Sequence, residues 1–184
     1  MQLAIPQEWQ DVLKEVQAVF PSAVIAGGAL RDLMNNKPIK DVDIFVPIYE
    51  DYVGSLDAAY EAVWNMFKGE TINLDPASEY HSSELNTDRD IHAIFDLIRG
   101  PLFEETQYDI ILCKPEAALV HTFDINICQI IYDGKQVRFT GAYAHGILTR
   151  TIKVMNVNRT DRNQRRVERM QEKYTDFTVE QWNE

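Results

Sequence analysis

Hydrophobic and polar positions follow two different periods along this chain, and the period indicates which segments form helices. Apolar residues recur at three- and four-residue spacing in several segments, as expected for helices with one buried face. The segments expected as helices or helical turns are Ile5–Phe20, Ala29–Met34, Tyr52–Phe67, Pro115–His121, Ala142–Leu148 and Gln164–Tyr174. Pro6 suits the first turn of the first helix, and Pro21 ends that helix.

Short apolar or alternating runs between these helices predict β-strands. The expected strands are Ala23–Ala26, Asp41–Val46, Thr71–Leu74, Tyr108–Cys113, Phe123–Tyr132 and Gln136–Thr140, with a further regular segment at Ile91–Ile98. The dipeptide Asp133-Gly134 indicates a tight hairpin, so part of the sheet is antiparallel. Strands and helices do not alternate regularly, which favours an α+β domain with a small mixed β-sheet flanked by helices.

The segment Gly69–Asp90 departs from both periods. It contains six acidic residues against one basic residue, Arg89. We expect a polar excursion here, apart from the strand at Thr71–Leu74.

Length, charge and cysteine content narrow the class of protein. The chain has 184 residues, of which 45% are hydrophobic and 26% charged, as in a single globular domain. Its net charge of -11 argues against binding of nucleic acid by the whole surface, but not against a local polyanion site. Cys113 and Cys128 lie in apolar runs, where buried free thiols are expected rather than a disulfide. With no secretory or membrane-spanning pattern, we expect a cytoplasmic protein.

A glycine pair follows the first predicted strand. Gly27 and Gly28 separate that strand from the helix expected at Ala29–Met34. Glycine permits a sharp turn and a close approach of a ligand to the backbone, and a helix start offers free N–H groups to a phosphate. An ordinary structural turn has the same sequence, so the glycine pair alone leaves both interpretations open.

Two carboxylates stand two residues apart on the second predicted strand. Asp41 and Asp43 therefore share one face of the strand, while Val42 and Ile44 share the other. Neighbouring carboxylates repel each other unless a cation lies between them, and hard oxygen ligands suit Mg²⁺ or Mn²⁺ bound to substrate phosphates. The alternative is a solvated pair at a strand end, and the preceding glycine turn favours the metal site.

A site for two metal ions usually needs a third acid from a neighbouring strand. Asp124 and Asp109 are the two candidates, each near the start of a predicted strand. We favour Asp124, because its strand is longer and places Asn126 on the same face.

These residues together resemble a known signature. Gly-Gly-Ala-Leu-Arg-Asp at Gly27–Asp32, followed by Lys-Asp-Val-Asp-Ile-Phe-Val at Lys40–Val46, is similar to the head domain of the DNA polymerase β-type nucleotidyltransferase superfamily. The closest resemblance is to tRNA CCA-adding enzymes and bacterial poly(A) polymerases. It is tight over Val24–Val46 and loose over Tyr108–Thr140.

The resemblance implies a role for each matching residue. Gly27 and Gly28 would hold the triphosphate of an NTP, with Arg31 and Lys40 among the nucleotide-binding residues. Arg31 is also a candidate for a structural ion pair. The acids that would bind two Mg²⁺ or Mn²⁺ ions, and so act in catalysis, are Asp41, Asp43 and Asp124.

The chain also departs from the CCA-adding pattern. Those enzymes continue into a neck and further helical domains, which we do not expect in the 184 residues of this sequence. Their Arg-Arg-Asp-Phe-Thr-Ile-Asn-Ala run is represented here only by Phe-Asp-Ile-Asn-Ile at Phe123–Ile127. The resemblance therefore implies transfer of a nucleoside monophosphate to an acceptor hydroxyl, with an RNA (tRNA) 3′ end as one acceptor. A protein or small-molecule acceptor, as in toxin-like members, and an inactive nucleotide-binding relative are the alternatives.

The stretch from Arg150 to Lys173 is basic, with eight basic and three acidic residues and a local net charge of +5. Five of these basic residues form one stripe at helical spacing: Arg162, Arg165, Arg166, Arg169 and Lys173. The stripe either binds a polyanion, such as RNA or the triphosphate, or pairs with the protein's own acidic groups. We expect a catalytic domain at residues 1–149 and a basic helical extension at 150–184 packed on it.

Overall fold

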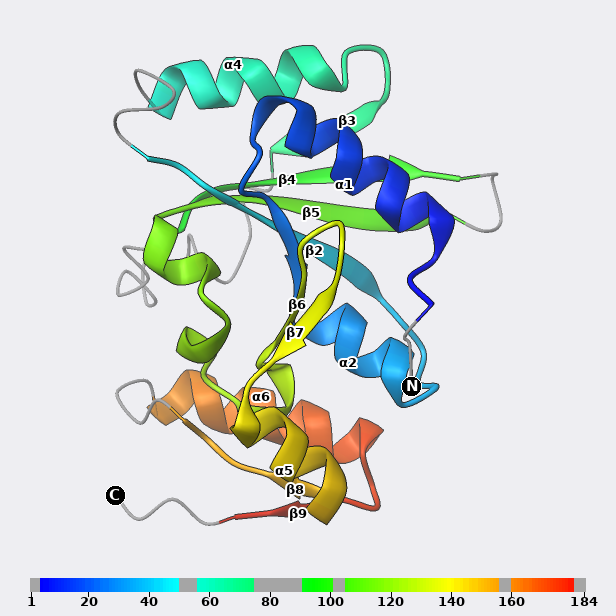
Figure 1. Ribbon diagram of the computed structural model, residues 1–184, viewed down its shortest axis with the longest axis vertical. Helices are drawn as coiled ribbons and strands as arrows, with labels where there is room; N and C mark the ends of the chain where they lie inside the picture. The colour runs from blue at the N-terminus through cyan, green and yellow to red at the C-terminus, as the bar shows by residue number, and fades with distance from the viewer. Residues whose placement is uncertain (1–3, 50–55, 75–90, 101–104, 156–159, 181–184) are drawn as a thin grey trace.

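A seven-stranded mixed sheet forms the centre of the molecule (Figure 1). The computed structural model describes residues 4–49, 56–74, 91–100, 105–155 and 160–180, with side chains in helix α6 from Asn163 onward. The strand order is β3-β4-β5-β2-β1-β6-β7. The strands of this sheet are β1 (Val24–Ala26), β2 (Asp41–Pro47), β3 (Thr71–Leu74), β4 (Ile91–Arg99), β5 (Thr106–Cys113), β6 (Ile130–Tyr132) and β7 (Val137–Phe139).

Strands β2 and β5 pair in parallel, and every other neighbouring pair of described strands in this sheet is antiparallel. The helices are α1 (Gln7–Val19), α2 (Gly28–Met34), α4 (Leu56–Met66), α5 (Gly141–Thr149) and α6 (Thr160–Lys173). Short 3-10 turns lie at η2 (Pro115–Ala118), η3 (Val120–Thr122) and η4 (Asn126–Cys128). This arrangement confirms the predicted α+β class with a mixed sheet flanked by helices.

Helices α1 and α4 cover one face of the sheet and form the main core with it (Figure 1). The apolar side chains of α1 lie three and four residues apart, so Trp9, Leu13 and Val16 all face inward and are buried. They join a cluster that includes alternate residues of the central strands, such as Val42 and Ile110. The opposite positions of the same strands therefore face away from this core.

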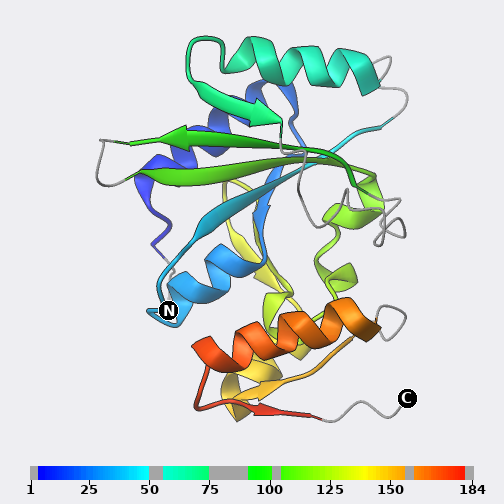
Figure 2. The same ribbon diagram turned by 180° about the vertical axis from the view of Figure 1, so that it is seen from behind.

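A second, smaller core lies beneath the sheet, where α5 and α6 pack against η4 and a short pair of parallel strands, β8 (Thr151–Ile152) and β9 (Thr178–Val179). Figure 2 shows α6 next to α2 in this part of the molecule. Residues at the helical spacing of α6 fill the small core, with Val167, Met170 and Tyr174 buried against Ile125 and Ile152. The C-terminal helix is thus packed on the domain.

The strand predicted at Phe123–Tyr132 is wrong over most of its length. The chain forms η4 before the short strand β6, so Asp124 and Asn126 do not share a strand face. The Asn126 side chain explains the difference, because its Nδ2 donates to the Thr151 carbonyl at 2.9 Å and its Oδ1 accepts from the Lys153 amide at 2.8 Å. With the bond from the Asn126 amide to the Lys153 carbonyl at 2.9 Å, these contacts hold the segment against the residues around β8 instead of in the large sheet.

The other predicted segments agree with the structure in place and type, with shifted ends. The helix expected at Tyr52–Phe67 is described from Leu56 to Met66. Strand β3 is confirmed, and the rest of the polar excursion, residues 75–90, lies outside the described residues. No helix in the described part of the chain has both the length and the apolar character needed to cross a membrane.

The α1 packing gives a direct stability prediction. Leu13 is fully buried between α1 and the sheet, so Leu13→Ala should lower the free energy of unfolding by about 2–5 kcal/mol. Leu148→Ala is the matched control, because that leucine is 84% exposed and its truncation should change stability by less than about 0.5 kcal/mol. Denaturant unfolding of both variants measures the difference, and equal losses would contradict the proposed packing of α1.

Candidate nucleotidyltransferase site

The glycine turn lies directly beside the acidic strand. Strand β1 ends at Ala26, and Gly27 adopts a φ of +73°, a conformation that favours glycine. The Gly27 amide donates to the Ile130 carbonyl at 2.9 Å, which fixes the turn on β6. A Cβ placed on Gly27 would lie 4.0 Å from Oδ2 of Asp43. The two sequence motifs, separated by a loop in the chain, therefore meet in space.

Strand pairing places a row of carboxylates on one face of the sheet. Asp43 is directly opposite Asp109 in the parallel pairing of β2 with β5, and Asp109 is directly opposite Asp96 in the antiparallel pairing with β4. Paired residues on neighbouring strands project to the same face, and Asp41, two residues from Asp43, shares it. This is the face opposite the α1 and α4 core.

The carboxylates of this row interact strongly enough to alter their protonation. Burial, together with the charges of Asp41 and Asp109, raises the pKa of Asp43 to about 7. Burial also raises the pKa of Asp109 to about 6, with Asp41 and Asp96 adding to the effect. Negative charge is thus concentrated at this point of the sheet, where it is unfavourable without a counter-cation.

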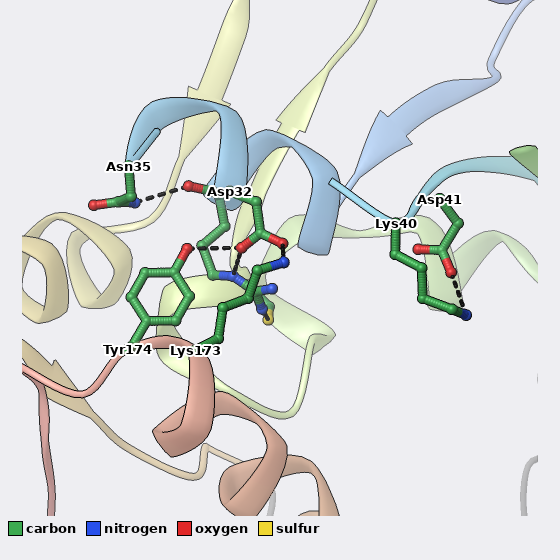
Figure 3. A network of polar contacts seen from close by, with 8 residues as sticks. Asp32, Asn35, Lys40, Asp41, Lys173 and Tyr174 are labelled. Carbon is green, nitrogen blue, oxygen red and sulfur yellow. Dashed lines mark hydrogen bonds and ion pairs between the residues drawn. The ribbon is translucent and has the colours of Figure 1, made fainter. Parts of the chain in front are cut away.

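Two polar side chains donate hydrogen bonds to carboxylates of this acidic row. Lys40 donates to Oδ2 of Asp41 at 2.9 Å from an exposed position (Figure 3), and this hydrogen bond raises the pKa of Lys40. Gln107 donates to Oδ1 of Asp109 at 2.8 Å. Within the described residues, no group of three or more His, Cys, Asp or Glu side chains is gathered closely enough to hold a metal ion as it stands. The donor set of Asp41, Asp43 and Asp109 nevertheless fits a hard divalent cation, because it consists of carboxylate oxygens on one face.

Asp124 lies in a different environment from the acidic row. It is buried, and its Oδ2 accepts from Nη1 of Arg166 on α6 at 2.8 Å. The structure brings Asp41 and Asp43 together with Asp109, and brings Asp124 together with Arg166. Arg166 also opposes the rise in the pKa of Asp43, so its charge reaches the acidic row.

Arg31 and Asp32 form a buried ion pair on α2, the helix that begins at Gly28, and Figure 3 shows Lys173 and Tyr174 directed at Asp32. Arg31 donates from Nε to Oδ1 of Asp32 at 2.7 Å and from Nη1 to Sγ of Cys128 at 3.1 Å. From α6 and the residue after it, Lys173 donates to Oδ2 of Asp32, and the Tyr174 hydroxyl donates to Oδ1 at 2.7 Å. Burial would raise the pKa of Asp32, but the bonds from Arg31, Lys173 and Tyr174 outweigh it and lower that pKa.

Two residues of the basic stripe form ion pairs within the protein. Arg166 and Lys173 are seven residues apart, on one side of α6, and pair with Asp124 and Asp32. Arg165 and Arg169 are exposed, and the side chain of Arg162 lies outside the described residues. Internal pairing is therefore confirmed for two of the five residues.

Sequence reasoning missed Asp96, which lies in the apolar run of β4. Its isolated position among hydrophobic residues was a signal, but its relation to Asp109 depends on a strand register that the sequence does not reveal. Tyr174 was predicted to end the last helix, and its hydroxyl contact with Asp32 was not foreseen. The two cysteines are buried and free, as predicted.

The fold is shared with several solved structures. A tRNA-processing enzyme in an apo form is similar with a TM-score of 0.61 and 16% sequence identity, and the match covers 98% of this chain and 46% of that one. A Thermotoga maritima CCA-adding enzyme complexed with tRNA has a TM-score of 0.61 and 15% identity, with 96% of this chain and 40% of that one covered. A CCA-adding enzyme complexed with ATP has a TM-score of 0.62 and 16% identity, with the same two coverages of 96% and 40%. The chain has the nucleotidyltransferase-like fold of these proteins and spans less than half of their length.

A family model gives a more specific assignment than the fold does. A model of the Gabija anti-defense 2 (Gad2) family matches residues 5–150, so the chain belongs to that family. A comparison with curated proteins yields no match.

The ionic cluster predicts a large effect of a small substitution. Asp32→Asn keeps the side-chain shape but leaves the buried Arg31 guanidinium without its carboxylate, which should cost about 3–5 kcal/mol of unfolding free energy. Asp176→Asn breaks a surface pair with Arg150 at 3.0 Å and should cost less than about 1 kcal/mol. Denaturant unfolding compares the two, and a similar small loss for both would show that the cluster does not anchor α2.

The raised pKa of Asp43 predicts a pH-dependent stability. Without metal, the raised pKa keeps Asp43 protonated in the folded protein up to about pH 7, whereas the unfolded chain ionises this residue near pH 4. The contribution of Asp43 to the free energy of unfolding is therefore full below about pH 4 and is lost as the pH rises to about 7. Asp43→Asn cannot ionise, and should stabilise the metal-free protein by on the order of 1–3 kcal/mol at about pH 8 but little at about pH 4.5. Thermal unfolding at both pH values measures this, and a pH-independent difference would contradict the assignment.

Proposed function

We propose that the protein is a metal-dependent nucleotidyltransferase that moves a nucleoside monophosphate from an NTP to an acceptor hydroxyl. The observation that carries the proposal is the junction of Gly27, Asp43 and Asp109, where a glycine turn adjoins carboxylates from two neighbouring parallel strands. In the reaction the acceptor oxygen bonds to the α-phosphorus, the bond between the α- and β-phosphates breaks, and pyrophosphate leaves. The nucleotidyltransferase-like fold supports this class of chemistry.

Asp41, Asp43 and Asp109 are the residues that we propose to hold the divalent ions. We choose Asp109 over Asp124 as the third acid, because Asp109 is in register with Asp43 while Asp124 accepts a bond from Arg166. Bound Mg²⁺ or Mn²⁺ would supply the positive charge that activates the acceptor hydroxyl and neutralises the leaving pyrophosphate. The carboxylates place that charge beside the glycine turn, where we expect the phosphates.

The nucleotide side of the site consists of Gly27, Gly28, Arg31 and Lys40. At Gly27 the positive φ and the missing side chain let a phosphate approach the backbone beside Asp43. A Cβ on Gly28 would lie 3.7 Å from Nη2 of Arg31, so that guanidinium supports the turn with positive charge. Lys40 is exposed and can leave Asp41 for a phosphate at little cost, since exposed ion pairs are weak.

Two kinds of acceptor are candidates, and a different observation supports each. The CCA-adding structure complexed with tRNA suggests an RNA 3′ end, to which the exposed Arg165 and Arg169 offer positive charge. The Gabija anti-defense description of the family suggests instead an acceptor that belongs to that defence system. We place either reaction in the cytoplasm, in keeping with two free buried thiols.

A transfer assay tests the proposal. The protein is incubated with each α-labelled NTP, Mg²⁺ or Mn²⁺, and either total RNA or lysate of cells carrying a Gabija system, and labelled products are separated by size and by nuclease or protease sensitivity. Nuclease-sensitive label identifies an RNA acceptor, and protease-sensitive label a protein one. Binding of NTP with no transfer to any fraction would contradict enzymatic function and favour an inactive nucleotide-binding relative.

The acidic row predicts which substitutions abolish transfer. Asp43→Asn and Asp109→Asn should each lower the transfer rate at least about a hundredfold, because each removes a ligand of the ions that stabilise the reacting phosphate. Asp176→Asn removes an exposed acid that pairs with Arg150 and belongs to neither the acidic row nor the glycine turn, so it should leave the rate unchanged. Initial rates at saturating NTP measure the effect, and a near-parental rate for Asp109→Asn would remove it from the site.

A further inference from the structure

The pair of Arg166 and Asp124 has features that packing alone does not explain. The Asp124 side chain is 9% exposed, and the described residues provide its Oδ1 with no hydrogen-bond partner, while its Oδ2 binds Arg166. Burying a carboxylate with one oxygen unsatisfied is costly, and a buried ion pair adds little net stability. A pair kept in spite of this cost is a candidate for a functional role.

Arg166 is also more accessible than Arg31, which pairs with the buried Asp32. The side chain of Arg31 is 9% exposed and is bound to Asp32 and Cys128, whereas the side chain of Arg166 is 23% exposed. The carboxylate of Asp124 thus lies deeper than the guanidinium that it holds. An anion from solvent can therefore reach Arg166 more readily than Arg31.

Helix α6 is fixed relative to the glycine turn at a second point. Lys173, two turns after Arg166, pairs with Asp32 on α2, the helix that begins at Gly28 (Figure 3). Contacts at both points hold α6 in one position along the site. The position of Arg166 relative to the glycine turn is therefore set by the fold rather than by a flexible tail.

We propose that Arg166 binds the β- or γ-phosphate of the nucleotide and that Asp124 is the positioning residue that orients Arg166 for this contact. The inference rests on the proposed function, because it needs a triphosphate at the glycine turn. A guanidinium suits this task, since its planar donors match two phosphate oxygens in a fixed geometry. Asp124, predicted from the sequence as a metal ligand, then serves the phosphate side of the site.

Binding measurements with ATP and AMP in Mg²⁺ test this assignment, because the two nucleotides differ only in the phosphates that Arg166 would contact. Arg166→Ala should weaken ATP binding roughly tenfold to a hundredfold and leave AMP binding unchanged. Arg166→Lys should recover part of the loss. Arg138→Ala is the matched control, since Arg138 forms an exposed 2.8 Å pair with Asp133 on the hairpin, and it should change neither affinity.

Asp124→Asn tests the positioning role. It should weaken ATP binding less than Arg166→Ala does, and should have no further effect on ATP binding in the Arg166→Ala background, where there is no guanidinium left to orient. The double variant also removes the uncompensated buried carboxylate, so a folded protein remains available for measurement. Circular dichroism confirms folding before titration.

These measurements distinguish an error in the role of Arg166 from an error in the proposed function. If the parent protein binds ATP more tightly than AMP and Arg166→Ala keeps that ratio, the role of Arg166 is wrong while the proposed function stands. An equal loss of ATP and AMP binding would also overturn it, because that result indicates a general structural defect. If the parent binds neither nucleotide in Mg²⁺, the proposed function itself fails.

Discussion

The parallel pairing of β2 with β5 is the constraint on which the candidate site depends. It places Asp43 beside Asp109, and β4 adds Asp96 to the same row. Hydrophobic burial of the opposite face fixes this register, because a shift of one residue would turn Val42 and Ile44 toward the acids' face and the acids into the core. The concentration of negative charge is thus a consequence of the same alternation that builds the core.

Basic side chains of the C-terminal helix pair with two carboxylates that lie outside the sheet. Helix α6 brings Arg166 to Asp124 and Lys173 to Asp32, and Tyr174 adds a hydroxyl bond to the same carboxylate. The net charge of -11 therefore conceals a local balance, in which Asp124 before η4 and Asp32 on α2 pair with bases from the C-terminal helix. This pairing also explains why a basic stripe in an acidic protein is only partly available to an external polyanion.

Local patterns were enough to predict the fold class and the closeness of the glycine turn to the Asp41–Asp43 strand. Period-two alternation identified β2 and a short apolar run identified β5, and Gly27 with Asp43 followed from spacing along a short stretch of chain. The choice between Asp109 and Asp124 depended on which strands are neighbours, which is a long-range property. The greater length of its predicted strand favoured Asp124, but Asn126 bonds to the β8 segment and the short turn η4 replaces the middle of that strand. Asp96 and the Asp32 cluster depend on tertiary contacts in the same way.

A crystal structure with Mn²⁺ and a non-hydrolysable NTP analogue, using the anomalous signal of manganese, tests the central claim most directly. The acidic row predicts anomalous peaks about 2.1–2.2 Å from carboxylate oxygens of Asp41, Asp43 and Asp109, beside the glycine turn. A peak coordinated by Asp124 instead of Asp109, or no peak at the row while the nucleotide is bound, would contradict it.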